Sequence, residues 1–263
     1  NDHSDDEQKK LLENIVLNLP NVRLIHSDRP PGKKNALTQA IEKSAYPFIL
    51  CTDADCRPIS EFWIHTMINA VDGQTLVLGY SPYKQTAGLL NRFIRFETVM
   101  TAMQYSSWAL LNAPYMGVGR NMLYPKSIFE KSQPFAGHQH VAYGDDDLLV
   151  QAVKNKIDVN VCLDYDSFVR TEAPTSFSEW IKQKHRHLSA GHHYSFLSWL
   201  QPGLLGLFLV IHCLLLIPVF LCCFQLWMLT GFITALVTRW GTYTSWTERL
   251  GARETKFYYP LFE

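Results

Sequence analysis

Apolar residues recur every three or four positions in several parts of the chain, and this spacing predicts amphipathic helices. The predicted helices cover residues 7–19, 35–44, 61–71, 89–111 and 147–156. Short apolar runs predict strands over residues 22–25, 48–52 and 75–80. The run at 48–52 is continuous, which is typical of a strand buried on both faces. Strands that alternate with helices predict an α/β fold with a mostly parallel sheet.

The most apolar segment lies near the C-terminal end. Residues 202–238 contain no Asp, Glu, Lys or Arg over 37 positions. One helix of that length would measure about 55 Å, whereas the hydrocarbon core of a membrane is about 30 Å thick. We therefore expect a transmembrane hairpin with spans at 196–217 and 219–238 and a turn near Pro218. The alternative is a pair of helices buried in a soluble domain.

Charge predicts an orientation and disfavours one class of partner. The chain has 24 basic and 24 acidic residues, so no overall positive field favours nucleic acid. Basic residues flank both ends of the predicted hairpin: Lys182, Lys184, Arg186, Arg239, Arg249 and Arg253. Because cytoplasmic loops carry an excess of Lys and Arg, both flanks are expected in the cytoplasm. The six cysteines show no zinc or disulfide spacing, which agrees with a reducing compartment.

The first candidate site is Asp53-Ala54-Asp55, directly after the predicted strand at 48–52. Side chains two positions apart on a strand point the same way, so the two carboxylates are expected to converge at the end of the strand. Paired carboxylates suit Mg²⁺ or Mn²⁺ together with the phosphates of a substrate. The alternative is a solvated turn that happens to carry two acidic residues.

Two further motifs open helices. Gly32-Lys33 precedes the helix at 35–44, where a glycine, a lysine and free amides are suited to hold phosphate. Gly144-Asp145-Asp146-Asp147 precedes another helix, and crowding of like charges raises the pKa of at least one carboxyl group, which favours a general base. The alternatives are a basic loop and an acidic helix cap.

A basic segment at 180–187 lies just before the first predicted span. Its Lys and Arg side chains suit phosphate, and the ring of Trp180 suits the face of a sugar. The alternative is the positive flank that accompanies any membrane span.

In this order, over residues 1–193, the motifs resemble those of the family 2 glycosyltransferases, which are inverting enzymes of the GT-A type. The resemblance implies that Asp53 and Asp55 bind the metal and the diphosphate of a nucleotide sugar. It implies that Asp145-Asp146 is the family's paired-acid motif, with Asp146 as the base and Asp147 as the alternative. The family's Q-x-x-R-W motif is matched by Gln183, Arg186 and His187, and the histidine replaces the usual tryptophan.

The same resemblance implies weaker assignments. It places Gly119, Arg120 and Asn121, with Trp180 and His187, on the acceptor side. It places Asp2 against the base of the nucleotide. The other donor-binding residues that it implies, besides Asp53 and Asp55, are Gly32, Lys33, Gln183 and Arg186. The first strand of the family would precede residue 1, so we expect a fragment truncated at both ends.

The predicted protein is thus a GT-A-like domain at 1–193, a transmembrane hairpin at 194–240 and a cytoplasmic or interfacial segment at 241–263. Its expected partners are a nucleotide-sugar donor, a lipid or glycan acceptor and a membrane, with the catalytic domain in the cytoplasm, as at a bacterial inner membrane. Mg²⁺ or Mn²⁺ is the expected cofactor. The alternatives are a non-catalytic membrane-associated binding protein on the same fold and a metal-dependent nucleotidyltransferase or phosphotransferase.

Overall fold

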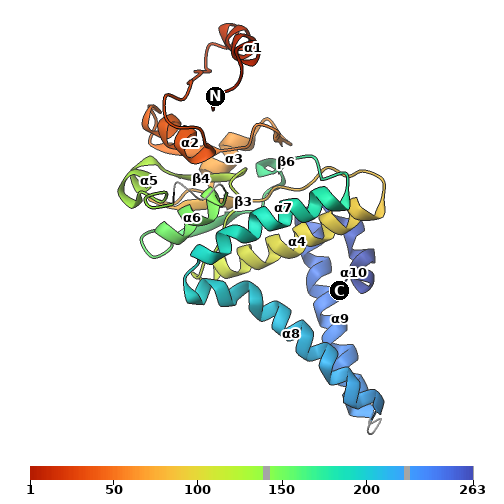
Figure 1. The fold of residues 1–263 in the computed structure, drawn as a ribbon. Helices are drawn as coiled ribbons and strands as arrows, with labels where there is room; N and C mark the ends of the chain where they lie inside the picture. Colours follow the sequence, from red (N-terminus) through yellow and green to blue (C-terminus); the bar gives the residue numbers. More distant parts are fainter. Residues whose placement is uncertain (139–142, 222–225, 263) are drawn as a thin grey trace.

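The computed structural model describes residues 1–138, 143–221 and 226–262, and it places two long helices below an α/β body (Figure 1). The strands are β1 (Phe48–Cys51), β2 (Arg57–Pro58), β3 (Leu76–Gly79), β4 (Met122–Pro125), β5 (Val159–Cys162) and β6 (Val169–Arg170). The α-helices are α1 (Asp6–Leu17), α2 (Lys33–Glu42), α3 (Trp63–Asn69), α4 (Leu89–Leu110), α5 (Lys126–Ser132), α6 (Asp145–Val153), α7 (Phe177–Ser189), α8 (Phe196–Leu221), α9 (Leu226–Arg249) and α10 (Tyr259–Phe262). Short 3₁₀ helices are η1 (Tyr165–Ser167), η2 (Ala190–His193) and η3 (Arg253–Tyr258).

The main sheet is mixed, so the prediction of a mostly parallel sheet was wrong. Its order is β1-β4-β3-β5, and β4 is antiparallel to both β1 and β3, while β3 and β5 are parallel. After β3, α4 and the loop at 111–121 return the chain to the end of the sheet where β3 stopped. Asn121 there accepts the N–H of Gly79 through its carbonyl, at 2.9 Å. The next strand therefore has to run in the opposite direction.

The strands buried on both faces are β3 and β4, not the expected segment at 48–52. Leu76 and Leu78 pack into the main core with α4 and α6, whereas Val77 points to the opposite face with Met67 of α3. This alternation is the two-residue period of a strand. β1 has a neighbour on one side only, so its residues are half-buried. The expected strand at 48–52 itself is confirmed.

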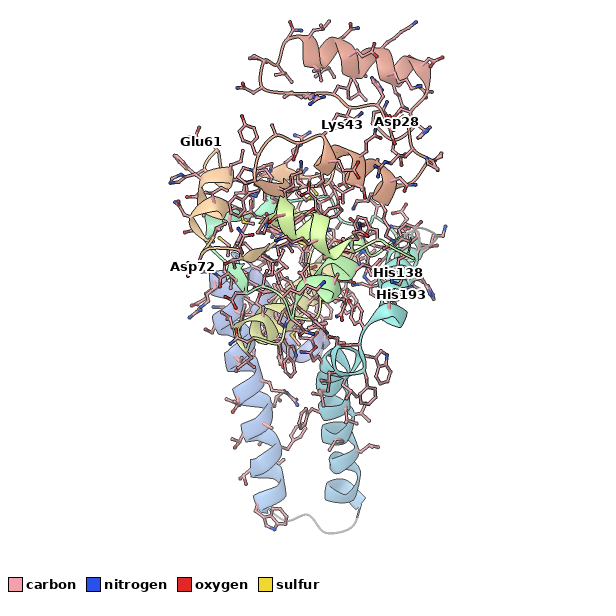
Figure 2. The ribbon with its side chains drawn as sticks, turned by 90° about the vertical axis from the view of Figure 1, so that its left-hand side faces the viewer. Asp28, Lys43, Glu61, Asp72, His138 and His193 are labelled. Carbon is pink, nitrogen blue, oxygen red and sulfur yellow. The ribbon has the colours of Figure 1, made fainter. Side chains whose placement is uncertain are left out.

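Residues 22–25 do not form a strand, contrary to expectation. They lie outside regular secondary structure, and the carbonyl group of Ile25 accepts a hydrogen bond from the N-terminal amine of Asn1 at 2.7 Å. A strand needs a row of hydrogen-bonded neighbours, and this segment lacks such a row among the described residues. Helix α1 lies apart from the sheet (Figure 2) and buries none of its residues.

Helices α8 and α9 extend away from the α/β body on the same side (Figures 1 and 2). In the part of the chain that the structure describes, no helix meets the length and apolarity that a membrane crossing requires. α8 continues through Pro218 to Leu221, so the turn expected near Pro218 is not there. A proline removes one hydrogen bond of a helix but does not by itself end it.

α9 runs without a break through the expected boundary at residue 240 and reaches Arg249. Its last turns pack on the α/β body, because Tyr243 is fully buried with its ring centroid 5.0 Å from that of Phe96 on α4. The ring of Tyr259 on α10 also lies 5.0 Å from Tyr243. The C-terminal residues thereby form part of the main core.

Candidate functional site

Asp53 and Asp55 come together through a turn rather than along a strand. β1 ends at Cys51, and the N–H of Cys56 donates to the carbonyl of Asp53 at 3.1 Å, which closes a tight turn. The predicted convergence is confirmed, but strand alternation is not its cause. Thr171 Oγ1 donates to Asp55 Oδ2 at 3.4 Å and helps to orient that carboxylate.

This turn offers a set of metal donors that includes a residue beyond the sequence prediction. One ligand atom each from Asp53, Asp55 and Cys56 lies within 4.8 Å of the others. Two carboxylate oxygens suit the divalent cation that the motif implied, and a thiol adds a softer donor. The residues present therefore fit a divalent metal ion.

Lys33 connects the turn at residues 53–56, here called the metal turn, to the acidic run at 145–147. Its Nζ lies 2.9 Å from Asp53 Oδ1 and 3.2 Å from Asp145 Oδ2. Partial desolvation opposes the charge, but the two carboxylates outweigh it and raise the pKa of Lys33 above its ordinary value. Lys33 is thus a fixed ammonium group at physiological pH.

The three acidic residues at the start of α6 have different environments. Asp146 Oδ2 accepts the N–H of Gly119 at 2.9 Å, and Asp146 Oδ1 accepts the N–H of Asp147 at 3.0 Å. Asp147 is only 8% exposed. Burial and the charges of Asp146 and Asp145 raise its pKa well above the ordinary value, although its contacts with Tyr194 and Gly117 oppose that rise. Burial, more than crowding of like charges, also raises the pKa of Asp145.

A pocket of about 450 Å³ lies between α2, β1 and α6. Polar groups gather at one part of its wall, namely Lys33, Asp53, Asp145 and Asp146, with Gly119 beside them. Leu37, Ile41, Phe48 and Phe135 supply apolar parts of the wall. The structure thus brings four predicted polar residues from three separate motifs to one cavity. Asp147 does not line it.

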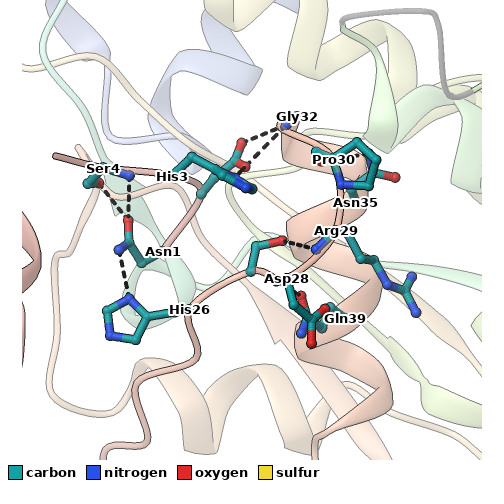
Figure 3. Close-up of polar contacts among 12 residues, drawn as sticks. Asn1, His3, Ser4, His26, Asp28, Arg29, Pro30, Gly32, Asn35 and Gln39 are labelled. Atoms are coloured by element: carbon teal, nitrogen blue, oxygen red, sulfur yellow. Dashed lines mark hydrogen bonds and ion pairs between the residues drawn. The ribbon is translucent and has the colours of Figure 1, made fainter.

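Asp2 and Gly32 meet at the start of α2. Both carboxylate oxygens of Asp2 accept the N–H of Gly32, at 3.1 and 3.0 Å (Figure 3). Gly32 has φ +140°, a conformation that side-chain-bearing residues rarely adopt, so glycine is needed there. Two residues that were each predicted to bind the donor are therefore in direct contact with one another.

The structure places Arg120 between the metal turn and α7. Its guanidinium lies 4.9 Å from the centroid of the Tyr83 ring, and the Tyr83 hydroxyl accepts from Gln183 Nε2 at 3.1 Å. Arg120 also interacts electrostatically with Cys56 and Asp53. Tyr83 therefore links Gln183 and Arg120, two residues assigned to different sides of the site.

The other predicted residues of α7 lie outside the pocket. Trp180 Nε1 donates to Glu97 Oε2 on α4 at 3.2 Å, and its ring stacks on Phe177. Arg186 lies 5.7 Å from the centroid of the Tyr143 ring, and His187 is exposed. Among the described residues, none of α7 contributes to the pocket lining.

Asn121 is placed in the interior rather than on an acceptor surface. It is fully buried, and its Nδ2 donates to the carbonyls of Tyr80 and Ser167 at 2.9 and 2.8 Å. Its Oδ1 accepts from Trp63 Nε1 at 3.0 Å. A Cβ on Gly79 would lie 2.3 Å from Asn121 Nδ2. Asn121 therefore ties together β3, α3 and η1, which is a structural role.

Sequence reasoning missed several residues that complete the site. Four of them contact predicted site residues: Cys56, Tyr83, Thr171 and Tyr194. The fifth is Lys34, whose Nζ donates to the carbonyl of Tyr143, just before the acidic run at 145–147, at 3.0 Å. Cys56 and Lys34 are adjacent to residues that were singled out, so proximity in sequence was a usable signal for them. Tyr83, Thr171 and Tyr194 act through contacts with distant segments, and no local pattern marks them.

The chain matches a known family. The family model described as Glycosyl transferase family 2 matches residues 1–132 of the 263. The matched part includes Asp2, Gly32, Lys33, Asp53 and Asp55 and ends before α6 and α7. No curated protein matches this chain.

Proposed function

Because this chain belongs to glycosyltransferase family 2, we propose that it transfers a sugar, with inversion, from a nucleoside-diphosphate sugar to a hydroxyl group of a lipid or glycan acceptor. The observation that carries the proposal is the meeting of Lys33, Asp53 and Asp146 at one pocket. These are a cation for phosphate, a metal-binding carboxylate and a carboxylate free of an ion pair among the described residues.

The donor's diphosphate would lie beside the turn at 53–56. A divalent cation held there by Asp53 and Asp55, as Mg²⁺ or Mn²⁺, supplies charge neutralisation for the leaving diphosphate. Lys33 adds a positive charge whose position two carboxylates fix. Fixed charge of this kind stabilises a developing negative charge without reorganisation.

Asp146 is the proposed general base. It removes the proton of the acceptor hydroxyl while that oxygen attacks the anomeric carbon on the face opposite the diphosphate. Asp146 lines the pocket, and two backbone N–H groups orient its carboxylate. The alternative, Asp147, is buried behind it and contacts Gly117 and Tyr194. Asp145 is engaged by Lys33.

We also propose that α8 and α9 anchor the protein in a membrane, with the catalytic domain in the cytoplasm, where nucleotide sugars are available. Residues 202–238 carry no charge. Large apolar side chains along α8 are exposed, including Phe196 at 72%, Leu207 at 55% and Phe208 at 66%. A face of this kind is typical of contact with lipid or another apolar partner.

A donor screen tests the enzymatic proposal. The full chain is incubated with Mn²⁺, a panel of nucleoside-diphosphate sugars and lipid or glycan acceptors, and the released nucleoside diphosphate and the glycosylated product are measured. We expect one donor to give both products, and Asp146→Asn to remove them while donor binding persists. Formation of a nucleotidyl or phosphoryl bond instead of a glycosidic bond would refute the proposal, and so would donor binding without turnover over the whole panel.

A further inference from the structure

Cys56 stands next to the two carboxylates of the metal turn and has no other chemical assignment. It is a free, half-buried cysteine. Its Sγ lies 3.5 Å from Asp55 Oδ1, its nearest recorded polar contact. The hydrogen bond from Cys56 N–H to the carbonyl of Asp53 fixes the backbone of the turn, so the thiol is held on the same side as the carboxylates.

The distances suit a shared ion. Oxygen and sulfur ligands lie at about 2.0–2.3 Å from small divalent cations. Donor atoms that already lie within 4.8 Å of one another need only side-chain rotation to reach a common ion. The two carboxylates are held from outside, Asp53 by Lys33 and Asp55 by Thr171. Such outer contacts orient the ligands.

We propose that Cys56 is a third ligand of the metal at this site, and that its sulfur makes the site prefer Mn²⁺ and thiophilic ions such as Co²⁺ and Cd²⁺ over Mg²⁺. The inference rests on the proposed function, because it concerns the metal of the same site. On coordination the S–H bond is lost, its proton passes to solvent, and the thiolate electron pair binds the ion. A site with two carboxylates alone is a hard oxygen site, whereas a thiolate shifts selectivity towards softer ions.

Absorption spectroscopy with Co²⁺ alone tests the ligand directly. A thiolate bound to Co²⁺ gives a charge-transfer band in the near ultraviolet that carboxylates do not give. The full chain should show this band, and Cys56→Ser should lose it. Cys51→Ser is the matched control, since Cys51 is also half-buried and free, with its Sγ 3.2 Å from the Tyr124 hydroxyl. We expect that control to keep the band.

A second variant guards against simple loss of folding. Cys56→Asp replaces the soft donor with a hard one, so Mg²⁺ binding should strengthen relative to Mn²⁺. We expect the ratio of the two affinities, measured by calorimetry with each metal alone, to change by about tenfold or more, the scale at which even outer-shell changes act. An unfolded protein would not gain affinity for Mg²⁺.

The outcomes separate the inference from the proposed function. If the full chain binds Mn²⁺ but shows no Co²⁺ charge-transfer band, Cys56 is not a ligand and the inference fails, while the two-carboxylate site stands. A band that persists in Cys56→Ser, or an affinity ratio unchanged in Cys56→Asp, overturns it as well. If the full chain binds neither metal, the metal-dependent function fails, and the inference fails with it.

Discussion

Asp147 gives the sharpest prediction, because the test separates a buried structural carboxyl group from the proposed general base, Asp146, one position before it. Asp147 is 8% exposed, and burial together with Asp146 and Asp145 raises its pKa well above 3.8. A raised pKa means that the folded state binds the proton more tightly than the unfolded state. The folded protein is therefore most stable, with respect to this group, below about pH 3.8, and it loses that stability as the pH rises through the folded pKa.

The magnitude follows from the linkage between pKa and stability. Each unit by which folding raises the pKa costs about 1.4 kcal/mol once the pH exceeds the folded value. Asp147→Asn removes this cost and retains an amide oxygen that accepts the Gly117 N–H, which donates to Oδ1 in the structure. A gain of about 1 kcal/mol raises the melting temperature of a chain of this size by about 2–4 °C.

Thermal melts of the full chain at a series of pH values measure this effect. Asp147→Asn should melt several degrees above wild type at pH 8, and the difference should shrink towards pH 4. Asp72→Asn is the control, since Asp72 lies on an exposed turn. Transfer by Asp147→Asn should stay within a fewfold of wild type, whereas Asp146→Asn should lose about 10²- to 10⁴-fold. Equal pH dependence in wild type and Asp147→Asn, or normal transfer in Asp146→Asn, would refute the reasoning.

Three further predictions concern the pocket and the membrane. Lys33→Met should weaken binding of a nucleoside diphosphate about tenfold or more in calorimetry, since it removes a charge held at the pocket; unchanged affinity would exclude a role for Lys33 in phosphate binding. Gly119→Ala should lower kcat about tenfold or more with little change in donor affinity, because the new Cβ would lie 3.1 Å from the Asp146 Cβ and displace the base; Gly241→Ala, with open space around its Cβ, is the control. The full chain should sediment with membranes after an alkaline wash, and recovery in the supernatant without detergent would contradict the proposed anchor.

The predicted helical ranges correspond to α1, α2, α3, α4 and α6, whereas α7, α10 and the arrangement of the sheet were not predicted. The expected helices at 89–111 and 61–71 match α4 and α3 closely. The signal for both is local, because apolar residues recur every three or four positions along the face that is buried. β4 is a strand of four residues, too short for its period to distinguish it. Its antiparallel direction depends on the point to which α4 and the loop at 111–121 return the chain. No local sequence pattern predicts that point.

Some features of the candidate site could likewise be predicted from the sequence, and others could not. Asp53, Asp55 and the run at 145–147 could be found because their residue types and order are unusual in themselves. The difference between Asp146 and Asp147 could not be read from the run, since it arises from burial beside Gly117 and Tyr194. The resemblance assigned Asn121 to the acceptor side, but three polar contacts hold it in the interior.

Because Lys33 lies between Asp53 and Asp145, these two carboxylates compete with an incoming anion for its ammonium group. A diphosphate that pairs with Lys33 has to exchange places with carboxylates that are covalently part of the site and therefore present at a high effective concentration. The same carboxylates recapture the ammonium group when the diphosphate departs. Affinity for the donor is thereby held below what the lysine alone would give, and the spent nucleotide leaves more readily. For an enzyme that must release a charged product in every cycle, this exchange favours turnover over tight binding.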